Sequence, residues 1–307
     1  MKKLSKSAII GYPAGIITGI AYGLNPLFGM PLLRAGASVE SVLFFRYSFA
    51  VLILGAYLVL RRQSFGVSRK QATVLLLLGA LYTASSVCLF ESYRYIASGL
   101  ATTLVFLYPA LVAVIMVFLR VVPSLPVWVA IFATFAGVAF MTYGGSDGSL
   151  NPLGVTLAIG SALAYALFIV VINRNRAIKD VSDTLLTFYT LCVGAVFFMT
   201  RILISGHDVT AGISGAGAWL NLIGLALLPT VVSTATLAVA TRNIGATKAS
   251  VLGVFEPITA ILVGAVALGE TLTTNIIVGI SVSGIHPKKA DLILSGRLRF
   301  CSCKGGV

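Results

Sequence analysis

Residues 94–109 read RYIASGLATTLVFLYP, and residues 242–257 read RNIGATKASVLGVFEP. The two stretches match at a constant offset of 148, with arginine, isoleucine and proline at equivalent positions. Ser85 and Ser233 extend the match at the same offset. Alanines and leucines match often by chance in an apolar chain, so they are weak evidence for a repeat. An arginine and a proline that match at one fixed spacing are stronger evidence. The chain therefore contains an internal repeat.

The repeat continues toward the start of each half at an offset of 143, where Glu40 aligns with Asp183. Small residues recur every four positions in both copies: Gly11, Gly15, Gly19 and Gly23 in the first, and Ala158, Ala162 and Ala166 in the second. Such a stripe lets two helix backbones approach closely in lipid, where hydrophobic association is weak. It predicts a static packing seam, a sliding surface between two moving halves, or both.

The composition places this repeat in a membrane. Of the 307 residues, 58% are apolar and 10% are charged, which excludes both a water-soluble and a disordered chain. A helix needs about 20 residues to cross a bilayer core of about 30 Å. Ten apolar runs are separated by short loops: 8–30, 39–60, 72–93, 98–119, 127–143, 153–172, 184–204, 218–240, 247–268 and 273–285. We expect an all-α, polytopic membrane protein, a ten-span bundle whose first run is not a cleaved signal.

The charges predict the orientation. Lys and Arg total 22 against 9 Asp and Glu, a net charge of +13. With the N-terminus inside, 18 basic residues fall in cytoplasmic segments and 3 lie outside, which places both termini in the cytoplasm. The positive charge is then expected to contact the lipid bilayer and no nucleic acid. Because five spans per half is an odd number, we expect two inverted five-helix repeats, 8–143 and 153–285, followed by a basic tail, 286–307.

The order and spacing of these features resemble the drug/metabolite transporter superfamily, EamA-type. The stretches 94–109 and 242–257 carry the resemblance, together with Phe255-Glu256-Pro257 and Leu268-Gly269-Glu270. It implies a permease of the inner membrane with a central cavity between two halves, usually an exporter of amino acids or other small metabolites. The tenth run departs from this pattern because it stops after 13 residues, at Ile285. We therefore expect a truncated or altered tenth span.

Polar residues inside apolar runs are costly in a membrane, so each is a candidate for the site. Glu256 lies near the middle of its run, directly before Pro257, whose missing N–H leaves a backbone carbonyl unpaired. Tyr108 occupies the equivalent position before Pro109. We expect Glu256 and Tyr108 to face each other at the centre, with Glu256 carrying a proton or binding a substrate ammonium group. The alternative is a fixed hydrogen bond between helices beside a proline kink.

Arg46 lies deep within the second run, and its guanidinium suits a substrate carboxylate. The alternative is a structural ion pair with Glu91, near the end of the third run. Other side chains suited to line the cavity and bind organic solutes are Tyr22, Asn25, Tyr82, Tyr165 and Tyr189. The alternative for each of these is helix packing, and Ser85 and Ser233 are expected to form interhelical hydrogen bonds.

The sequence has no H-E-x-x-H, G-x-S-x-G or Walker motif. We therefore expect no enzyme, no metal and no cofactor, and a monomer or homodimer that exports a small-molecule substrate by alternating access, driven by a gradient or by exchange. One alternative is an exchanger of phosphorylated or nucleotide-linked solutes, which would need several deep basic residues. The others are a membrane-embedded enzyme and a channel or scaffold; a channel would show neither saturation nor counterflow.

Overall fold

The computed structural model describes residues 6–119, 132, 151–206, 208–245, 249–250 and 252–269. Every regular element in this part of the chain is a helix, as the all-α class predicts. The elements are α1 (Lys6–Gly23), α2 (Asn25–Arg34), α3 (Val39–Leu60), α4 (Arg69–Ser92), α5 (Ser98–Val105), α6 (Tyr108–Phe118), α8 (Pro152–Arg174), η1 (Arg176–Ile178), α9 (Asp183–Ser205), α10 (Gly215–Ala226), η2 (Leu227–Val232), α11 (Ser233–Ile244) and α13 (Phe255–Ala267). Apart from Phe132, the expected fifth and tenth spans and the tail at 286–307 lie outside the described residues.

Seven helical stretches in the described ranges are long and apolar enough to cross a membrane, with mean hydropathies between 1.4 and 2.5. They correspond to the first four expected spans and to the sixth, seventh and eighth. The second expected span coincides with α3 from Val39 to Leu60. The ninth is represented by α13, which has 13 residues.

Several spans are broken near the middle of the bundle, which the hydropathy pattern does not predict. The first span divides at Leu24 into α1 and α2, and the fourth divides after Val105 into α5 and α6. The second helix of each pair begins with a proline in its first turn, Pro26 in α2 and Pro109 in α6. Pro257 likewise lies in the first turn of α13. Proline is tolerated there because the first N–H groups of a helix have no intrahelical partner.

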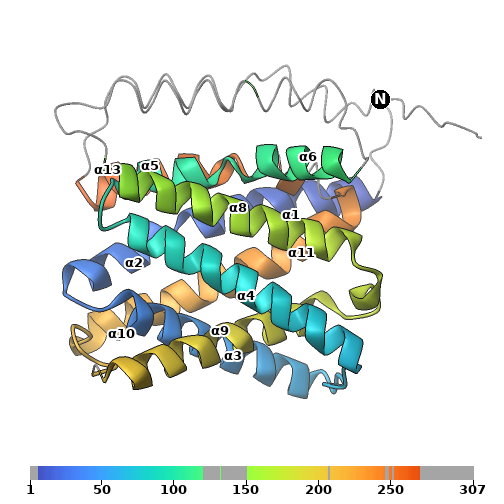
Figure 1. Cartoon of the computed structure of the whole chain (residues 1–307), viewed down its shortest axis with the longest axis horizontal. Coiled ribbons are helices and arrows are strands. Elements are labelled where there is room, and N and C mark those ends of the chain that lie inside the picture. The colour runs from blue at the N-terminus through green and yellow to red at the C-terminus, as the bar shows by residue number, and fades with distance from the viewer. Residues whose placement is uncertain are drawn as a thin grey trace, which may run out of the picture.

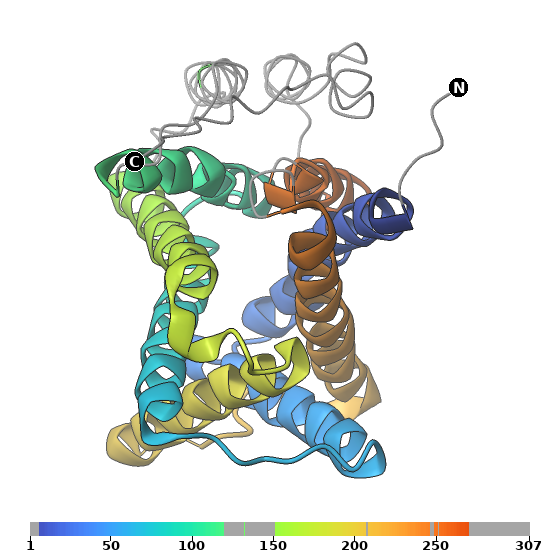
Figure 2. The same cartoon turned by 90° about the vertical axis from the view of Figure 1, so that its right-hand side faces the viewer.

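The helices pair between the two parts of the chain (Figure 1). α1 lies against α11, α4 against α8, α3 against α9, and α5 against α13. Viewed from one end of the bundle, these pairs form the four sides of a box (Figure 2). Each side thus combines a helix from the first half of the chain with one from the second.

The glycine stripe of α1 forms one of the closest contacts in the bundle. A Cβ atom placed on Gly19 would lie 2.8 Å from the Cβ of Phe255 and 3.1 Å from the carbonyl oxygen of Leu252. A Cβ atom on Gly23 would meet the carbonyl oxygen of Glu256 at 2.5 Å. The predicted close packing of the stripe is therefore confirmed, and its partner is the segment that carries Glu256. The second copy of the stripe in α8 is fully buried at Ala158, Ala162 and Ala166.

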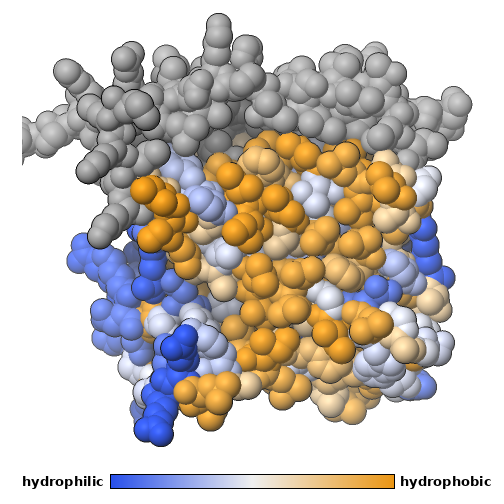
Figure 3. All heavy atoms as spheres, turned by 180° about the vertical axis from the view of Figure 1, so that it is seen from behind, coloured by the Kyte–Doolittle hydropathy of each residue, from blue (hydrophilic) through white to orange (hydrophobic). Residues whose placement is uncertain are grey.

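The exterior fits a membrane environment. On the face shown in Figure 3, apolar residues form a broad band across the middle, and hydrophilic residues gather at the two ends of the bundle. Large apolar side chains such as Leu60, Phe118 and Val266 are more than four-fifths exposed. We call the end where α1 begins the near end and the opposite end, where α2 meets α3, the far end.

Candidate substrate site

The helix breaks bring polar residues to the interior of the bundle. Glu256 lies in the first turn of α13 and is only 1% exposed. Its Oε1 atom accepts a hydrogen bond of 3.5 Å from the hydroxyl of Tyr108, the first residue of α6. Oε2 of Glu256 has no hydrogen-bond partner among the described residues. The two residues that the repeat aligns therefore meet, and one carboxyl oxygen remains available.

Arg46, the eighth of the 22 residues of α3, is fully buried. Its Nε atom donates a hydrogen bond of 2.7 Å to the hydroxyl of Thr230, while Nη1 and Nη2 have no partner in the described part of the chain. The guanidinium carbon lies 5.6 Å from the ring centroid of Phe90. The alternative partner, Glu91, instead forms an ion pair of 3.3 Å with Arg94, so an Arg46–Glu91 pair is wrong for this structure. A buried guanidinium without a counter-ion is costly, and such groups in membrane proteins mark functional sites.

Tyrosine rings connect the two charged groups. Tyr165 stacks on Tyr22 with centroids 6.0 Å apart, and it meets Tyr108 edge to face at 4.8 Å. The ring centroid of Tyr82 lies 6.5 Å from that of Tyr165. On the other side, Tyr82 stacks on Tyr47 with centroids 5.9 Å apart, and the guanidinium carbon of Arg46 lies 5.9 Å from the ring centroid of Tyr47.

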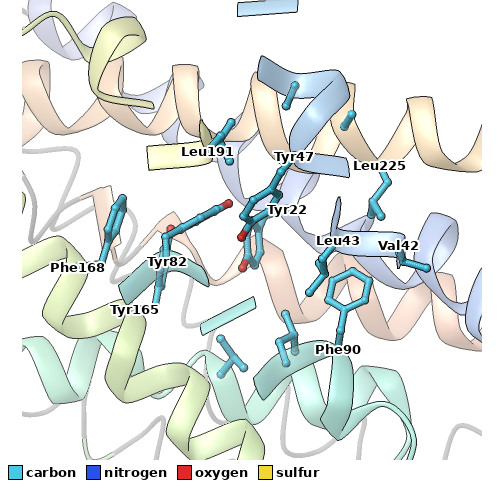
Figure 4. Close-up of a cluster of buried hydrophobic side chains, with 14 of the residues drawn as sticks. Tyr22, Val42, Leu43, Tyr47, Tyr82, Phe90, Tyr165, Phe168, Leu191 and Leu225 are labelled. Atoms are coloured by element: carbon cyan, nitrogen blue, oxygen red, sulfur yellow. The ribbon is translucent and has the colours of Figure 1, made fainter. Parts of the chain in front are cut away.

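Asn25 joins these residues through a hydrogen bond of 2.7 Å from its side-chain nitrogen to the carbonyl of Tyr22. We call the resulting set the central cluster: Tyr22, Asn25, Arg46, Tyr82, Tyr108, Tyr165 and Glu256. Figure 4 shows that the hydroxyl ends of Tyr22, Tyr47 and Tyr82 point into one region.

The central cluster holds several buried polar atoms without a hydrogen-bond partner in the described residues. They are Asn25 Oδ1, Arg46 Nη1 and Nη2, Tyr82 Oη and Glu256 Oε2. Buried polar groups in folded proteins are nearly always paired, because an unpaired group costs about 1–3 kcal/mol. Both donors and acceptors occur in this set, so the cluster is suited to a ligand that itself carries both.

The remaining sequence candidates lie elsewhere. Tyr189 is not part of the central cluster, because its hydroxyl donates a hydrogen bond of 2.6 Å to the carbonyl of Phe65 in the loop between α3 and α4. Ser85 forms an interhelical hydrogen bond of 3.1 Å with Ser161, as expected. Ser233 is buried in α11.

Sequence reasoning missed two buried partners of the cluster. Thr230 accepts the Arg46 hydrogen bond, and Tyr47 donates a hydrogen bond of 2.6 Å to Ser86 beside the guanidinium. The signal for Thr230 was available, because Pro229 directly precedes it in the middle of an apolar run.

Ion pairs lie at both ends of the bundle. At the near end, Nε of Arg242 lies 2.5 Å from a carboxylate oxygen of Asp183, at the start of α9. At the far end, Arg201 pairs with Glu40 at 3.3 Å. The far-end pair borders a cavity of about 280 Å³ that is also lined by Val39, Val87, Phe197 and Phe198.

Membrane-length helices that are broken around a buried, charged and aromatic cluster define a class of protein, the polytopic membrane transporter. The model of the EamA-like transporter family matches residues 9–143 and 152–285. The chain therefore belongs to the EamA-like transporter family, a family of membrane proteins that move small molecules across the lipid bilayer.

Named relatives agree with this assignment, and a solved structure shares the fold. The chain is 24% identical to the uncharacterized transporter YdfC of Bacillus subtilis over 287 residues, which is 92% of this chain and 89% of the relative. It is 31% identical over 206 residues to the uncharacterized transporter sll1319 of Synechocystis sp., and 32% identical over 126 residues to an uncharacterized transporter of Archaeoglobus fulgidus. The chain spans 59% and 43% of these last two relatives. A crystal structure with 13% identity shares the fold at a TM-score of 0.66, covering 89% of this chain and 93% of that one.

Proposed function

We propose that this protein is a secondary transporter that exports small zwitterionic metabolites, amino acids or related compounds, across the inner membrane. The observation that carries the proposal is that guanidinium nitrogens of Arg46 and a carboxyl oxygen of Glu256, each without a hydrogen-bond partner in the described residues, lie at the two ends of one series of contacting tyrosine rings. A guanidinium binds a carboxylate through two parallel hydrogen bonds. A carboxylate and tyrosine faces together bind an ammonium group. An amino acid supplies both of these charges on one small molecule.

The same cluster disfavours phosphorylated solutes. Arg46 is the single basic residue among the described members of the central cluster, and a phosphate or diphosphate carries more negative charge than one guanidinium neutralises. Glu256 adds a negative charge to the cluster when it is ionised. A zwitterion of low net charge is the better match.

The charges support an orientation with the near end in the cytoplasm. The described basic residues at the near end are Lys6, Arg61, Arg62, Arg69, Lys70, Arg174, Arg176, Lys179 and Arg242, whereas those at the far end are Arg34, Arg94 and Arg201. Excess Lys and Arg in short loops marks the cytoplasmic side of a membrane protein. Both termini are then cytoplasmic if the chain makes ten crossings.

The packing supports an inverted repeat of two five-helix units, 8–143 and 153–285. α1 packs on α11 and α13, just as α8, its counterpart, packs on α4 and α6. A third side of the box, α3 with α9, pairs a helix with its own counterpart at the offset of 143, and on the fourth side α5 packs against α13, the counterpart of α6. These relations are the ones that a two-fold axis in the membrane plane produces.

The ion pairs support alternating access. By the repeat offsets, Glu40 and Arg94 are the counterparts of Asp183 and Arg242. Asp183 and Arg242 are paired at the near end, whereas Glu40 is paired with Arg201 at the far end and Arg94 with Glu91. In our proposal this conformation is held closed at the near end, and in the opposite conformation Glu40 pairs with Arg94 as the Asp183–Arg242 pair separates.

Counterflow in proteoliposomes tests the proposed function. Purified protein is reconstituted, the vesicles are loaded with an excess of one unlabelled amino acid at a time, and entry of the same radiolabelled amino acid is followed. We expect saturable counterflow with a subset of amino acids and none with Arg46→Met, which keeps the apolar stem of the side chain but removes the guanidinium. Linear entry without counterflow would indicate a channel, and no entry with any amino acid would contradict the substrate class.

A further inference from the structure

The eighth span contains an unusual turn next to Arg46. Residues Leu227–Val232 form a π-helical segment, η2, with Pro229 inside it. In a regular α-helix the carbonyl of Leu225 would accept a hydrogen bond from the N–H of residue 229, but proline has none. The hydroxyl of Thr230 donates to that carbonyl instead, at 2.9 Å. Single π-helical turns of this kind are frequent at functional sites.

This turn fixes the direction of the next hydrogen bond. A threonine hydroxyl has one hydrogen to donate and two lone pairs to accept with. Since the hydrogen of Thr230 is directed to the Leu225 carbonyl, its oxygen is left to accept, and Nε of Arg46 donates to it at 2.7 Å. Thr230 is fully buried, so water does not compete for either bond.

The bond to Thr230 leaves Arg46 with one mode of carboxylate binding. A guanidinium binds a carboxylate either through Nε and one terminal nitrogen or through both terminal nitrogens. Nε is already bonded to Thr230, whereas Nη1 and Nη2 are buried and without a partner in the described residues. Phe90 and Tyr47 lie next to the guanidinium, with centroids 5.6 and 5.9 Å from its central carbon.

We propose that Thr230 is a positioning residue that orients Arg46 so that its two terminal nitrogens bind the carboxylate of the substrate end-on. Thr230 does not touch the substrate itself. Through Arg46 it determines that solutes with a carboxylate are preferred over the matching amines and esters. The inference rests on the proposed function, because it assigns the part of the site that recognises one half of the zwitterion.

The test compares Thr230→Val with Thr230→Ser in the full-length, purified protein. Valine keeps the shape of threonine but has no hydroxyl, whereas serine keeps the hydroxyl. Binding is measured by calorimetry with three sets of probes: free amino acids, their methyl esters, and monocarboxylates such as acetate and benzoate. Size-exclusion profiles and melting temperatures without ligand show whether each variant is folded.

We expect Thr230→Val to bind carboxylates about tenfold more weakly or worse, with its preference for acids over esters lost, since a lost hydrogen bond to a charged group weakens binding by about that factor or more. The affinity of Thr230→Ser for carboxylates is expected to stay within about twofold of that of the wild type. Its hydroxyl, like that of threonine, has one hydrogen to donate and two lone pairs to accept with. Arg46→Lys keeps the positive charge but lacks the two terminal nitrogens of the guanidinium. It is expected to lose the preference for acids over esters although Thr230 is intact. If Thr230→Val does not fold, an acid preference that Arg46→Lys retains still refutes the positioning role.

The outcomes separate this inference from the proposed function. If the wild type prefers acids over esters and Thr230→Val or Arg46→Lys keeps that preference, the positioning role is refuted while amino-acid transport stands. If the wild type binds monocarboxylates but no amino acid, the proposed substrate class is wrong, and the valine and serine variants still test Thr230 on the monocarboxylates. If the wild type binds no carboxylate at all, both are refuted.

Discussion

The contact between α1 and α13 predicts a steep response to side-chain size at Gly19. A Cβ atom there would lie 2.8 Å from the Cβ of Phe255, 3.1 Å from the carbonyl oxygen of Leu252 and 3.3 Å from the backbone nitrogen of Glu256. Ordinary van der Waals contact begins at 3.4 Å. Gly19→Ala therefore requires the two segments to separate by about 0.6 Å, and two of the three atoms in the way are backbone, which does not rotate aside.

The expected cost follows from this overlap. Overpacking typically lowers the free energy of unfolding by about 1–3 kcal/mol, and the higher helix propensity of alanine offsets at most about 1 kcal/mol of this loss. Gly19→Ala should therefore fold, but the shift of α13 should stretch the hydrogen bond between Tyr108 and Glu256, which is already 3.5 Å long. We expect folded protein with reduced transport for Gly19→Ala. Gly19→Leu adds a branched side chain in the same space and should lose folded protein or all transport.

The assay measures melting temperature and monodispersity in detergent, and counterflow in proteoliposomes with the amino acid that the wild type prefers. Ile20→Phe is the matched control, because Ile20 is the next residue in α1 and is 43% exposed. Its enlargement points away from the stripe and should leave both measurements close to those of the wild type. If Gly19→Leu melts and transports like Ile20→Phe, the packing argument is refuted.

Glu256→Gln is expected to leave the protein folded and abolish net transport. If substrate exchange is retained, Glu256 carries the coupled proton; if exchange is lost, Glu256 binds the substrate ammonium group. Normal transport at every pH would exclude Glu256 from the site. A reporter fused after Asp208 is expected to lie outside the cell, and a cytoplasmic reporter would contradict the inverted repeat. Arg242→Glu is expected to slow counterflow by about fivefold at most, since a partly exposed ion pair contributes up to about 1 kcal/mol. Adding Asp183→Arg should restore the rate through a reversed pair, and a further loss in the double variant would contradict the role of this pair in closing the near end.

The sequence predicts the spans well and their breaks poorly. Hydropathy depends on an average over about 20 residues, so the two-residue interruption before Tyr108 does not register. Pro257 indicated one irregular site, and Pro26 after Leu24 offered a similar signal that hydropathy does not record; α1 and α2 then pack against different helices. The π-helical turn at Pro229 is likewise a tertiary feature, because proline within a span is accommodated in more than one way.

The candidate site shows the same division. The meeting of Tyr108 and Glu256 was predicted, because a repeat relates positions across the whole bundle. The hydrogen bond from Arg46 to Thr230 was not predicted. The sequence offers Glu91 as an acidic neighbour of Arg46 but does not say which way either side chain points. Thr230 was overlooked because a threonine in an apolar helix commonly bonds to its own backbone, and here its hydroxyl does that and also accepts from Arg46.

Two hydrogen bonds of the central region join the halves of the chain. Arg46 in α3 donates to Thr230 in the eighth span, and Tyr108 in α6 donates to Glu256 in α13. Each bond involves one group on which the proposed binding of a zwitterion depends. A rigid movement of one half against the other must change at least one of these distances, and the orientation of Arg46 or the availability of Glu256 changes with it. Our proposal therefore implies that these bonds couple substrate affinity to the arrangement of the halves, and that a variant that lengthens either bond alters binding and the closure of the near end together.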